Sequence, residues 1–192
     1  MMVTKLIWSI RLLLLSFFYK GIKFPGYLGK PVLLLGFDKV FFGKRVRVFP
    51  NSRFEVHGEK SCIKIDNNVS IGQGFHITSG GELKICSDTV ISGNVVVTNI
   101  DHEYTTIGVP ILEQPNVVTP TLIGKNCFIG FGAVIQAGTV LGKHCVVGAN
   151  SVVKGHFPDY CVIVGSPAKI VKRYNFATKS WNRTDPKGVF FE

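Results

Sequence analysis

Residues 121–154 read TLIGKN-CFIGFG-AVIQAG-TVLGKH-CVVGAN-SVVK, a run in which one pattern returns every six residues. The first residue of each hexad is small and the third is aliphatic: Ile123, Ile129, Ile135, Leu141, Val147 and Val153. The sixth residue of each complete hexad tolerates a left-handed backbone: Asn126, Gly132, Gly138, His144 and Asn150. A period of six matches neither an α-helix nor an ordinary strand. It is typical of a coiled parallel β-helix, which needs one short strand and one tight corner per hexad.

The hexad spacing extends upstream to Val40, with interruptions at His57–Ser61 and near Ser79–Gly81. Downstream, the motif VGSPAK follows at residues 164–169. Repeat and motif together resemble the left-handed β-helix hexapeptide-repeat acyltransferases, and among them the maltose, galactoside and surface-polysaccharide O-acetyltransferases. The resemblance covers roughly residues 40–173. It alone implies a left-handed coil, because general chirality rules favour right-handed crossovers.

We therefore expect an all-β fold, a left-handed parallel β-helix (hexapeptide-repeat solenoid) of about five coils. It should carry an N-terminal helix, an extruded loop and a short C-terminal helix. Residues 1–39 are expected to form the helix and a linker, residues 40–173 the acyltransferase domain, and residues 174–192 a tail. Exposing the aromatic residues of the tail would be costly, so we expect them to pack on the body or on a neighbouring subunit: Phe176, Trp181, Phe190 and Phe191.

The extruded loop is expected at residues 98–120, where the hexads stop and three prolines appear. The coils resume at Thr121 in register, so the loop should project sideways from one corner of the solenoid. A long excursion from a regular solenoid is normally either functional or disordered. Two aliphatic pairs and few charges favour an ordered loop here.

Residues 3–20 form an apolar segment that also contains Lys5, Arg11 and Lys20. Its longest uncharged run is too short to span a bilayer, and it is expected to be helical. Two alternatives stay open for this helix. It could lie on a membrane surface as a peripheral contact, or it could pack on the open end of the solenoid.

The chain is basic, with 22 Lys and Arg residues against 12 Asp and Glu residues. This balance indicates an anionic partner such as a phosphorylated cofactor, an acidic glycan or a lipid surface. Basic residues occur along the whole chain without a nucleic-acid-binding motif, so we expect no nucleic acid partner. The five cysteines lack metal-finger spacing, and Cys127 and Cys145 occupy inward repeat positions. They are expected to be reduced core residues of a cytoplasmic protein.

His102, at the root of the loop, is the leading catalytic candidate. A single loop histidine is more often bonded to backbone, but the resemblance implies a catalytic histidine at the start of such a loop. A neutral imidazole can take a hydroxyl proton near pH 7 while the oxygen attacks a thioester. Asp101 or Glu103 could fix the tautomer of the ring. Tyr104 could line the acceptor pocket or pack in the core.

The remaining histidines have weaker claims. His76 lies one residue from an inward position and could approach the acceptor site, whereas His144 fills a corner position and His57 and His156 fall in turns. The γ-type carbonic anhydrases bind zinc through histidines five residues apart. This chain has no such pair, so no metal site is expected. No activated serine or cysteine indicates a covalent acyl-enzyme, which favours direct transfer between two bound substrates.

The resemblance implies a homotrimer with acetyl-CoA as donor, bound in the groove between adjacent β-helices. By motif matching, the amide of Gly130 or Phe131 faces the thioester oxygen and Ala149 contacts the pantetheine arm. Lys154, Lys169 and Lys172 meet the phosphates or the adenine end, or else are solvated surface lysines. The family usually has a small residue where this chain has Phe131, which could narrow the donor channel.

The expected function is acetyl-CoA-dependent O-acetylation of a sugar hydroxyl, on a surface polysaccharide or its lipid-linked precursor at the cytoplasmic membrane face. An N-acetyltransferase of an amino sugar would use the same scaffold. A non-catalytic trimeric β-helix scaffold is the alternative from another class. Serine acetyltransferase shares the repeat but has a helical N-terminal domain that residues 1–39 are too short to supply.

Overall fold

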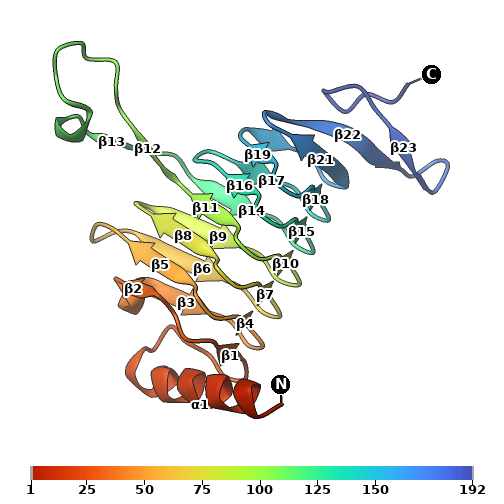
Figure 1. The fold of residues 1–192 in the computed structure, drawn as a ribbon. Helices are drawn as coiled ribbons and strands as arrows, with labels where there is room; N and C mark the ends of the chain where they lie inside the picture. Colours follow the sequence, from red (N-terminus) through yellow and green to blue (C-terminus); the bar gives the residue numbers. More distant parts are fainter. Residues whose placement is uncertain (1, 192) are drawn as a thin grey trace.

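The computed structural model describes residues 2–191 as a β-solenoid whose three faces are parallel sheets (Figure 1). The first face contains β1 (Tyr27–Leu28), β4 (Arg47–Val48), β7 (Ser70–Ile71), β10 (Val90–Ile91), β15 (Phe128–Ile129), β18 (Val146–Val147) and β21 (Cys161–Gly165). The second contains β2 (Leu33–Leu35), β5 (Arg53–Val56), β8 (His76–Ser79), β11 (Val96–Thr98), β16 (Val134–Ile135) and β19 (Val152–Val153). The third contains β3 (Val40–Phe42), β6 (Cys62–Ile65), β9 (Glu82–Ile85), β14 (Thr121–Ile123), β17 (Val140–Leu141) and β20 (His156–Phe157).

The predicted fold class is confirmed, with about seven turns rather than about five. The difference arises at both ends: β1 and β2 form a coil within the expected linker, and β20 and β21 add a further partial turn after Lys154. Tyr27 pairs with Arg47, and Leu33 pairs with Arg53, both in parallel register. The short 3-10 helix η1 (Phe37–Lys39) then leads into β3. Strand β1 has two residues and β2 has three, and both lie among prolines and glycines. Segments this short contain too few hexad positions to be predicted as strands from the sequence.

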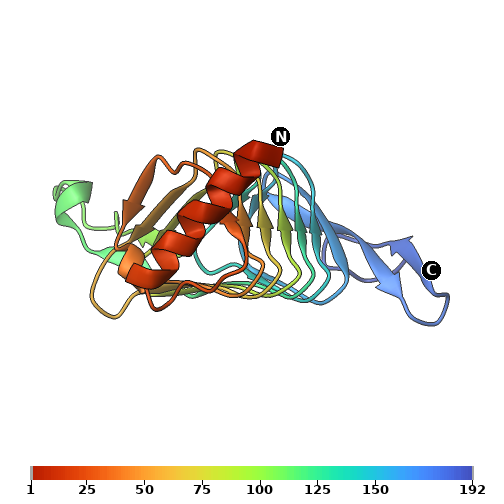
Figure 2. The same ribbon diagram turned by 90° about the horizontal axis from the view of Figure 1, so that it is seen from below.

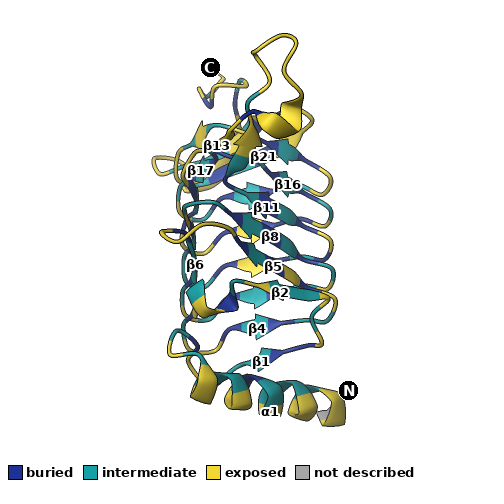
Figure 3. Cartoon of the chain, turned by 90° about the vertical axis from the view of Figure 1, so that its left-hand side faces the viewer, coloured by how far each residue is buried: buried dark blue, intermediate teal, exposed yellow. Residues whose placement is uncertain are grey.

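Each hexad places its aliphatic residue inside the solenoid and its permissive residue at a corner. Ile129, Ile135 and Leu141 are fully buried. Asn126 and Asn150 take φ values of 57° and 55°, the left-handed region in which asparagine costs little. Neighbouring coils repeat this arrangement in register, so the core is a continuous stack of apolar side chains. Figure 3 shows buried and intermediate residues along the strands of the coils.

The N-terminal helix α1 (Met2–Phe18) lies across the first coil (Figure 2). Leu12 is fully buried, Trp8 packs against the rings of Tyr27 and Phe49, and Arg11 donates a hydrogen bond to the Leu28 carbonyl. The alternative in which the helix covers the open end of the solenoid is therefore what the structure shows. Within residues 2–191, no helix is long and apolar enough to cross a membrane.

The expected short C-terminal helix is wrong. Residues 168–175 instead form β22 (Ala168–Asn175), which runs antiparallel to β21 and pairs with β23 (Ser180–Arg183). Ala168 and Ile170 are buried while Lys169 is exposed, which is the two-residue period of a strand. Of the four tail aromatics, Phe176 contacts Tyr160 and Tyr174, and Trp181 contacts Tyr174. Both nevertheless stay exposed, as does Phe191, and Phe190 is half-buried, so within one chain the tail aromatics are only partly covered.

Candidate active site

The extruded loop is an ordered antiparallel ribbon that projects from the solenoid (Figure 1). It comprises β12 (Ile100–His102), the 3-10 helix η2 (Ile111–Glu113) and β13 (Asn116–Val118). The buried side chain of Asn99 fixes its root by accepting from the Gly80 amide and donating to the Glu82 carbonyl. The buried Gln114 amide holds its tip by donating to the carbonyl of Val109. The expected excursion from the coils is therefore present, and hydrogen bonds hold it at its root and near its tip.

His102 ends β12 opposite Asn116 and is exposed. Its side chain lines a groove of about 480 Å³ over the second face, together with His57, His76, Thr78, Val96, Thr98, Ile100 and Asn116. Within residues 2–191, no side chain or backbone group is hydrogen-bonded to its ring. The imidazole is therefore available to exchange a proton with a molecule in the groove.

The two acidic neighbours of His102 are engaged elsewhere in the chain. Asp101 accepts hydrogen bonds from Lys154, at 3.1 Å, and from the backbone amide of His102, and these lower the pKa of its carboxyl. Glu103 accepts from the side chain and the amide of Thr105 and from the amide of Tyr104, which also lowers its pKa. Neither carboxylate contacts the ring of His102. The Tyr104 side chain is 69% exposed and does not line the groove.

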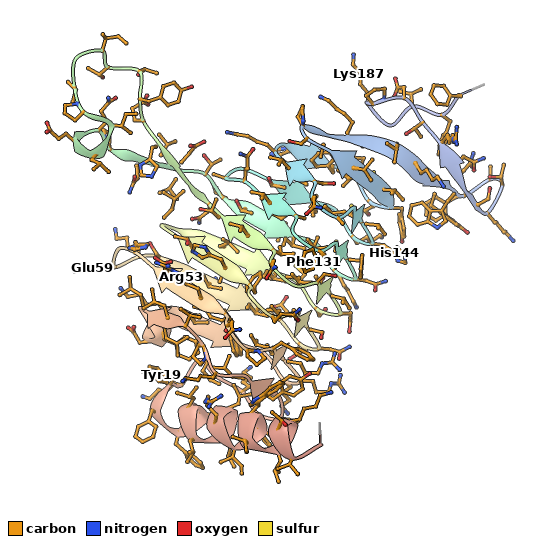
Figure 4. All side chains as sticks on the ribbon, viewed as in Figure 1. Tyr19, Arg53, Glu59, Phe131, His144 and Lys187 are labelled. Carbon is orange, nitrogen blue, oxygen red and sulfur yellow. The ribbon has the colours of Figure 1, made fainter. Side chains whose placement is uncertain are left out.

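His76 does share the groove with His102, as the sequence suggested, and it belongs to a cluster that sequence reasoning missed. Its Nε2 lies 3.0 Å from Glu55 Oε1 and 3.0 Å from Thr78 Oγ1. Glu55 also pairs with Arg53 and lies 3.5 Å from His57. Burial alone would raise the pKa of Glu55, but the hydrogen bonds from Arg53 and His76 lower it below the ordinary value. Figure 4 shows Arg53 on the same side of the solenoid as the loop.

A signal for this cluster does exist in the sequence. Arg53 pairs with His76, and Glu55 pairs with Thr78, on the neighbouring strands β5 and β8. All four are outward positions of the hexad pattern, so stacking the coils would have aligned them. The insertion at His57–Ser61 separates the β5 residues from the β8 residues by more than the length of one regular coil. Counting hexads along the sequence therefore does not reveal that the two pairs are aligned.

One corner of the solenoid brings together three of the expected donor-binding residues. A Cβ atom added to Gly130 would lie 2.6 Å from the Ala149 nitrogen, so these two backbones stack closely and glycine is required. The Gly130 amide donates to the Val147 carbonyl at 2.8 Å and is not free to bind a substrate. The adjacent Phe131 amide makes no hydrogen bond within the described chain, and its side chain is half exposed (Figure 4).

The three expected phosphate-binding lysines do not line one groove. Lys169 and Lys172 lie with Arg183 along a groove of about 450 Å³ between β22 and the tail. Lys154 is instead paired with Asp101, beside His102. For the described residues, no group of three His, Cys, Asp or Glu side chains is arranged to hold a metal ion.

Comparison with known proteins finds the same repeat and the same fold as described above. The bacterial transferase hexapeptide profile (six repeats) matches residues 120–155. WbbJ of Escherichia coli (strain K12), named as a lipopolysaccharide biosynthesis O-acetyl transferase, is 31% identical over 182 residues, which cover 89% of each chain. Rv3034c of Mycobacterium tuberculosis, named as an acetyltransferase, is 28% identical over 68% of this chain and 43% of its own length.

A solved structure shares the fold. AntD, an N-acyltransferase from Bacillus cereus in complex with dTDP and 3-hydroxybutyryl-CoA, superimposes with a TM-score of 0.65 at 18% identity, covering 78% of this chain and 79% of AntD. The long match to WbbJ, the repeat profile and the solenoid agree with one another. The chain belongs to the bacterial hexapeptide-repeat transferases and is an acetyltransferase of that family.

Proposed function

We propose that this protein transfers an acetyl group from acetyl-CoA to a sugar hydroxyl, with His102 as general base. The observation that carries the proposal is the unpartnered imidazole of His102 in a polar groove at the fixed root of the loop. In the reaction, His102 takes the hydroxyl proton as the sugar oxygen attacks the thioester carbon. The C–S bond breaks, and the departing CoA sulfur takes the proton back from the imidazolium. The base is therefore regenerated in each cycle.

The donor assignment rests on the bound CoA thioester in AntD and on two features of this chain. Lys169, Lys172 and Arg183 line a groove with the positive charge that CoA phosphates require. The free amide of Phe131 could donate to the thioester oxygen as negative charge develops on it. Because the Gly130 amide already donates to the Val147 carbonyl, the Phe131 amide is the better of the two expected hydrogen-bond donors to the thioester oxygen.

The active site is proposed to be completed in a homotrimer. The corner that contains Phe131 and Ala149 is not part of the groove that contains His102 within one chain. The loop tip also exposes Ile107 and Leu112, at 93% and 92%, although apolar side chains of this size favour burial. A neighbouring copy would cover the loop tip and bring its own corner to the groove.

The acceptor is proposed to be a surface glycan or its lipid-linked precursor. WbbJ, which matches over most of both chains, is named for O-acetyl transfer in lipopolysaccharide biosynthesis. AntD, matched only at the level of fold, is an N-acyltransferase, so amino-sugar acetylation is the second candidate. The groove offers Thr78, Thr98 and Asn116 as polar side chains that can orient a sugar hydroxyl or amine.

The test is an acetyl-CoA turnover assay with a panel of hydroxyl-only sugars and amino sugars. O-acetylation gives product whose acetyl is released by mild alkali, whereas N-acetylation gives an alkali-stable amide. His102→Ala should lower kcat by about two to four decades. The matched control is His156→Ala, another exposed histidine that lies outside the groove. Unchanged turnover in His102→Ala would refute its role as base.

A further inference from the structure

We propose that the outer face of α1 docks the first coil of this protein on an anionic membrane surface. This outer face consists of eight exposed apolar residues: Val3, Leu6, Ile7, Ile10, Leu13, Leu14, Phe17 and Phe18. Their spacing of three and four residues places all of them on one side of the helix. The opposite side is already occupied, because Leu12 is buried against the first coil. The helix is therefore apolar on two sides, and only one of them has a partner within the chain.

The cations of the helix do not interrupt its outer face. The Nζ atom of Lys5 lies 5.8 Å from the ring centroids of both Tyr27 and Phe49, on the side facing the solenoid. Arg11 likewise turns toward the solenoid and donates to the Leu28 carbonyl. The outer face consequently presents an uncharged surface that is flanked by positive charge. This is the distribution that favours binding at the boundary between lipid headgroups and acyl chains.

The positive charge of the chain is concentrated around this helix. Basic residues occur throughout the sequence, but residues 1–50 contain nine of them and only one acidic residue, Asp38. The remaining 142 residues contain 13 basic and 11 acidic residues and are nearly neutral. The exposed cations near the helix form a basic collar on the first two coils: Lys20, Lys23, Lys30, Lys44 and Arg45.

Charge decides which occupant fits the outer face. A second copy packed face to face would bring two basic collars together, and their like charges would repel. An anionic lipid surface covers the apolar residues and neutralises the collar at the same time. The end of the solenoid that carries α1, at the bottom of Figure 3, is then the end in contact with the membrane.

This orientation has a consequence that rests on the proposed function. The His102 groove spans β5, β8 and β11, the second to fourth strands of the second face. Successive coils are about 4.8 Å apart, so the groove would lie roughly 5–15 Å above the first coil. A glycan attached to a lipid could reach the groove at that height without leaving the membrane.

The test is flotation of the purified full chain with vesicles of phosphatidylcholine containing about a quarter phosphatidylglycerol. The protein should float with these vesicles, bind pure phosphatidylcholine vesicles more weakly, and be partly released at about 1 M salt. The double variant Leu6→Gln/Phe17→Gln should bind at least about tenfold more weakly. Lys20→Gln/Lys23→Gln should weaken binding about fivefold per charge at low salt.

The matched control is Val189→Gln/Phe191→Gln, which removes two apolar side chains of comparable exposure (62% and 66%) from the opposite, C-terminal end of the solenoid and should leave vesicle binding unchanged. Circular dichroism should show that all variants remain folded, since every substituted side chain is exposed. Equal flotation of the wild type and Leu6→Gln/Phe17→Gln would overturn the proposal. The proposal would also be overturned if the wild type failed to bind vesicles and Leu6→Gln/Phe17→Gln formed a smaller oligomer. The outer face would then join copies of the chain. No substrate is present, so failure here would leave the proposed acetyl transfer untouched.

Discussion

The hexads at residues 121–154 and the loop at residues 98–120 are neighbours in sequence, yet they use the same residue types in opposite ways. Ile129 and Ile135 in the hexads are fully buried, whereas Ile107 in the loop is 93% exposed. Asn150 forms a left-handed corner, whereas Asn116 faces the groove. The difference shows that periodic context determines the role of a side chain here. The coils supply a rigid frame, and the interruption supplies groups that remain free for chemistry.

The largest expected effect on stability tests the frame directly. Ile135→Ala removes a fully buried side chain from a closely packed stack and should lower the free energy of unfolding by about 2–5 kcal/mol. Ile107→Ala, the same substitution at the loop tip, should lower it by less than about 2 kcal/mol even where a neighbouring copy covers the tip. Urea unfolding of the two variants measures the contrast. Similar losses in both would mean that the loop tip is as structural as the coils.

The corners should tolerate only residues that accept a left-handed backbone. Asn150 has a φ of 55°, so Asn150→Val should cost about 1–2 kcal/mol. Asn150→Gly, which accepts this conformation, should stay close to wild type in the same unfolding experiment. A Val variant as stable as the Gly variant would show that the backbone of this corner can relax. The sixth hexad position would then not require a residue that accepts a left-handed conformation.

The stability of the folded protein should fall in acid because of Glu55, which is hydrogen-bonded to the groove residue His76. The pKa of Glu55 is lowered in the folded state, so its contribution is present above the ordinary value of 4.5 and is lost as the pH falls through the lowered pKa. Glu55→Gln should cost about 1–2 kcal/mol at pH 7, because Arg53 and His76 lose a charged hydrogen-bond acceptor. It should also flatten the fall of stability below pH 4.5. An unchanged acid profile would mean that Glu55 does not control it.

The smallest effect is expected where the loop meets the coils. The Asp101–Lys154 pair is more than half exposed on both sides, so its coupling energy should be between about 0 and 1 kcal/mol. A double-mutant cycle with Asp101→Asn and Lys154→Gln measures this value. A larger coupling would show that the pair anchors the loop root, which is assigned here to Asn99.

The sequence was most informative where the pattern repeats. The hexads predicted the solenoid, the inward residues and the left-handed corners, because each position is constrained by two neighbouring coils. The first coil was missed because β1 is only two residues long and lies among glycines and prolines. The C-terminal helix was inferred from resemblance alone, although the alternation in Ala168, Lys169 and Ile170 is typical of a strand.

The candidate site was predictable only in part for a related reason. Position along the chain identified His102 at the start of the loop and His76 near it. It could not find Arg53 and Glu55, because an insertion shifts β5 out of the hexad register with β8. Glu55 is hydrogen-bonded to the groove residue His76, and Arg53 pairs with Glu55. Sequence likewise grouped Lys154 with Lys169 and Lys172, whereas the structure pairs Lys154 with Asp101. Contacts between coils depend on the insertions, which hexad counting treats only as gaps.

Two histidines offer the most direct test of the central claim, one on the loop and one in the coils. His144 occupies a corner with a φ of 54°. Its Nδ1 lies 2.9 Å from the side-chain Nδ2 of Asn126, and its ring packs against Tyr160. We predict that His102→Ala lowers acetyl-CoA turnover by about two to four decades with unfolding unchanged. His144→Ala should lower stability by about 1–2 kcal/mol and leave the turnover of the folded protein near wild type. Full turnover in His102→Ala, or equal losses of turnover in both variants, would contradict this division between frame and chemistry.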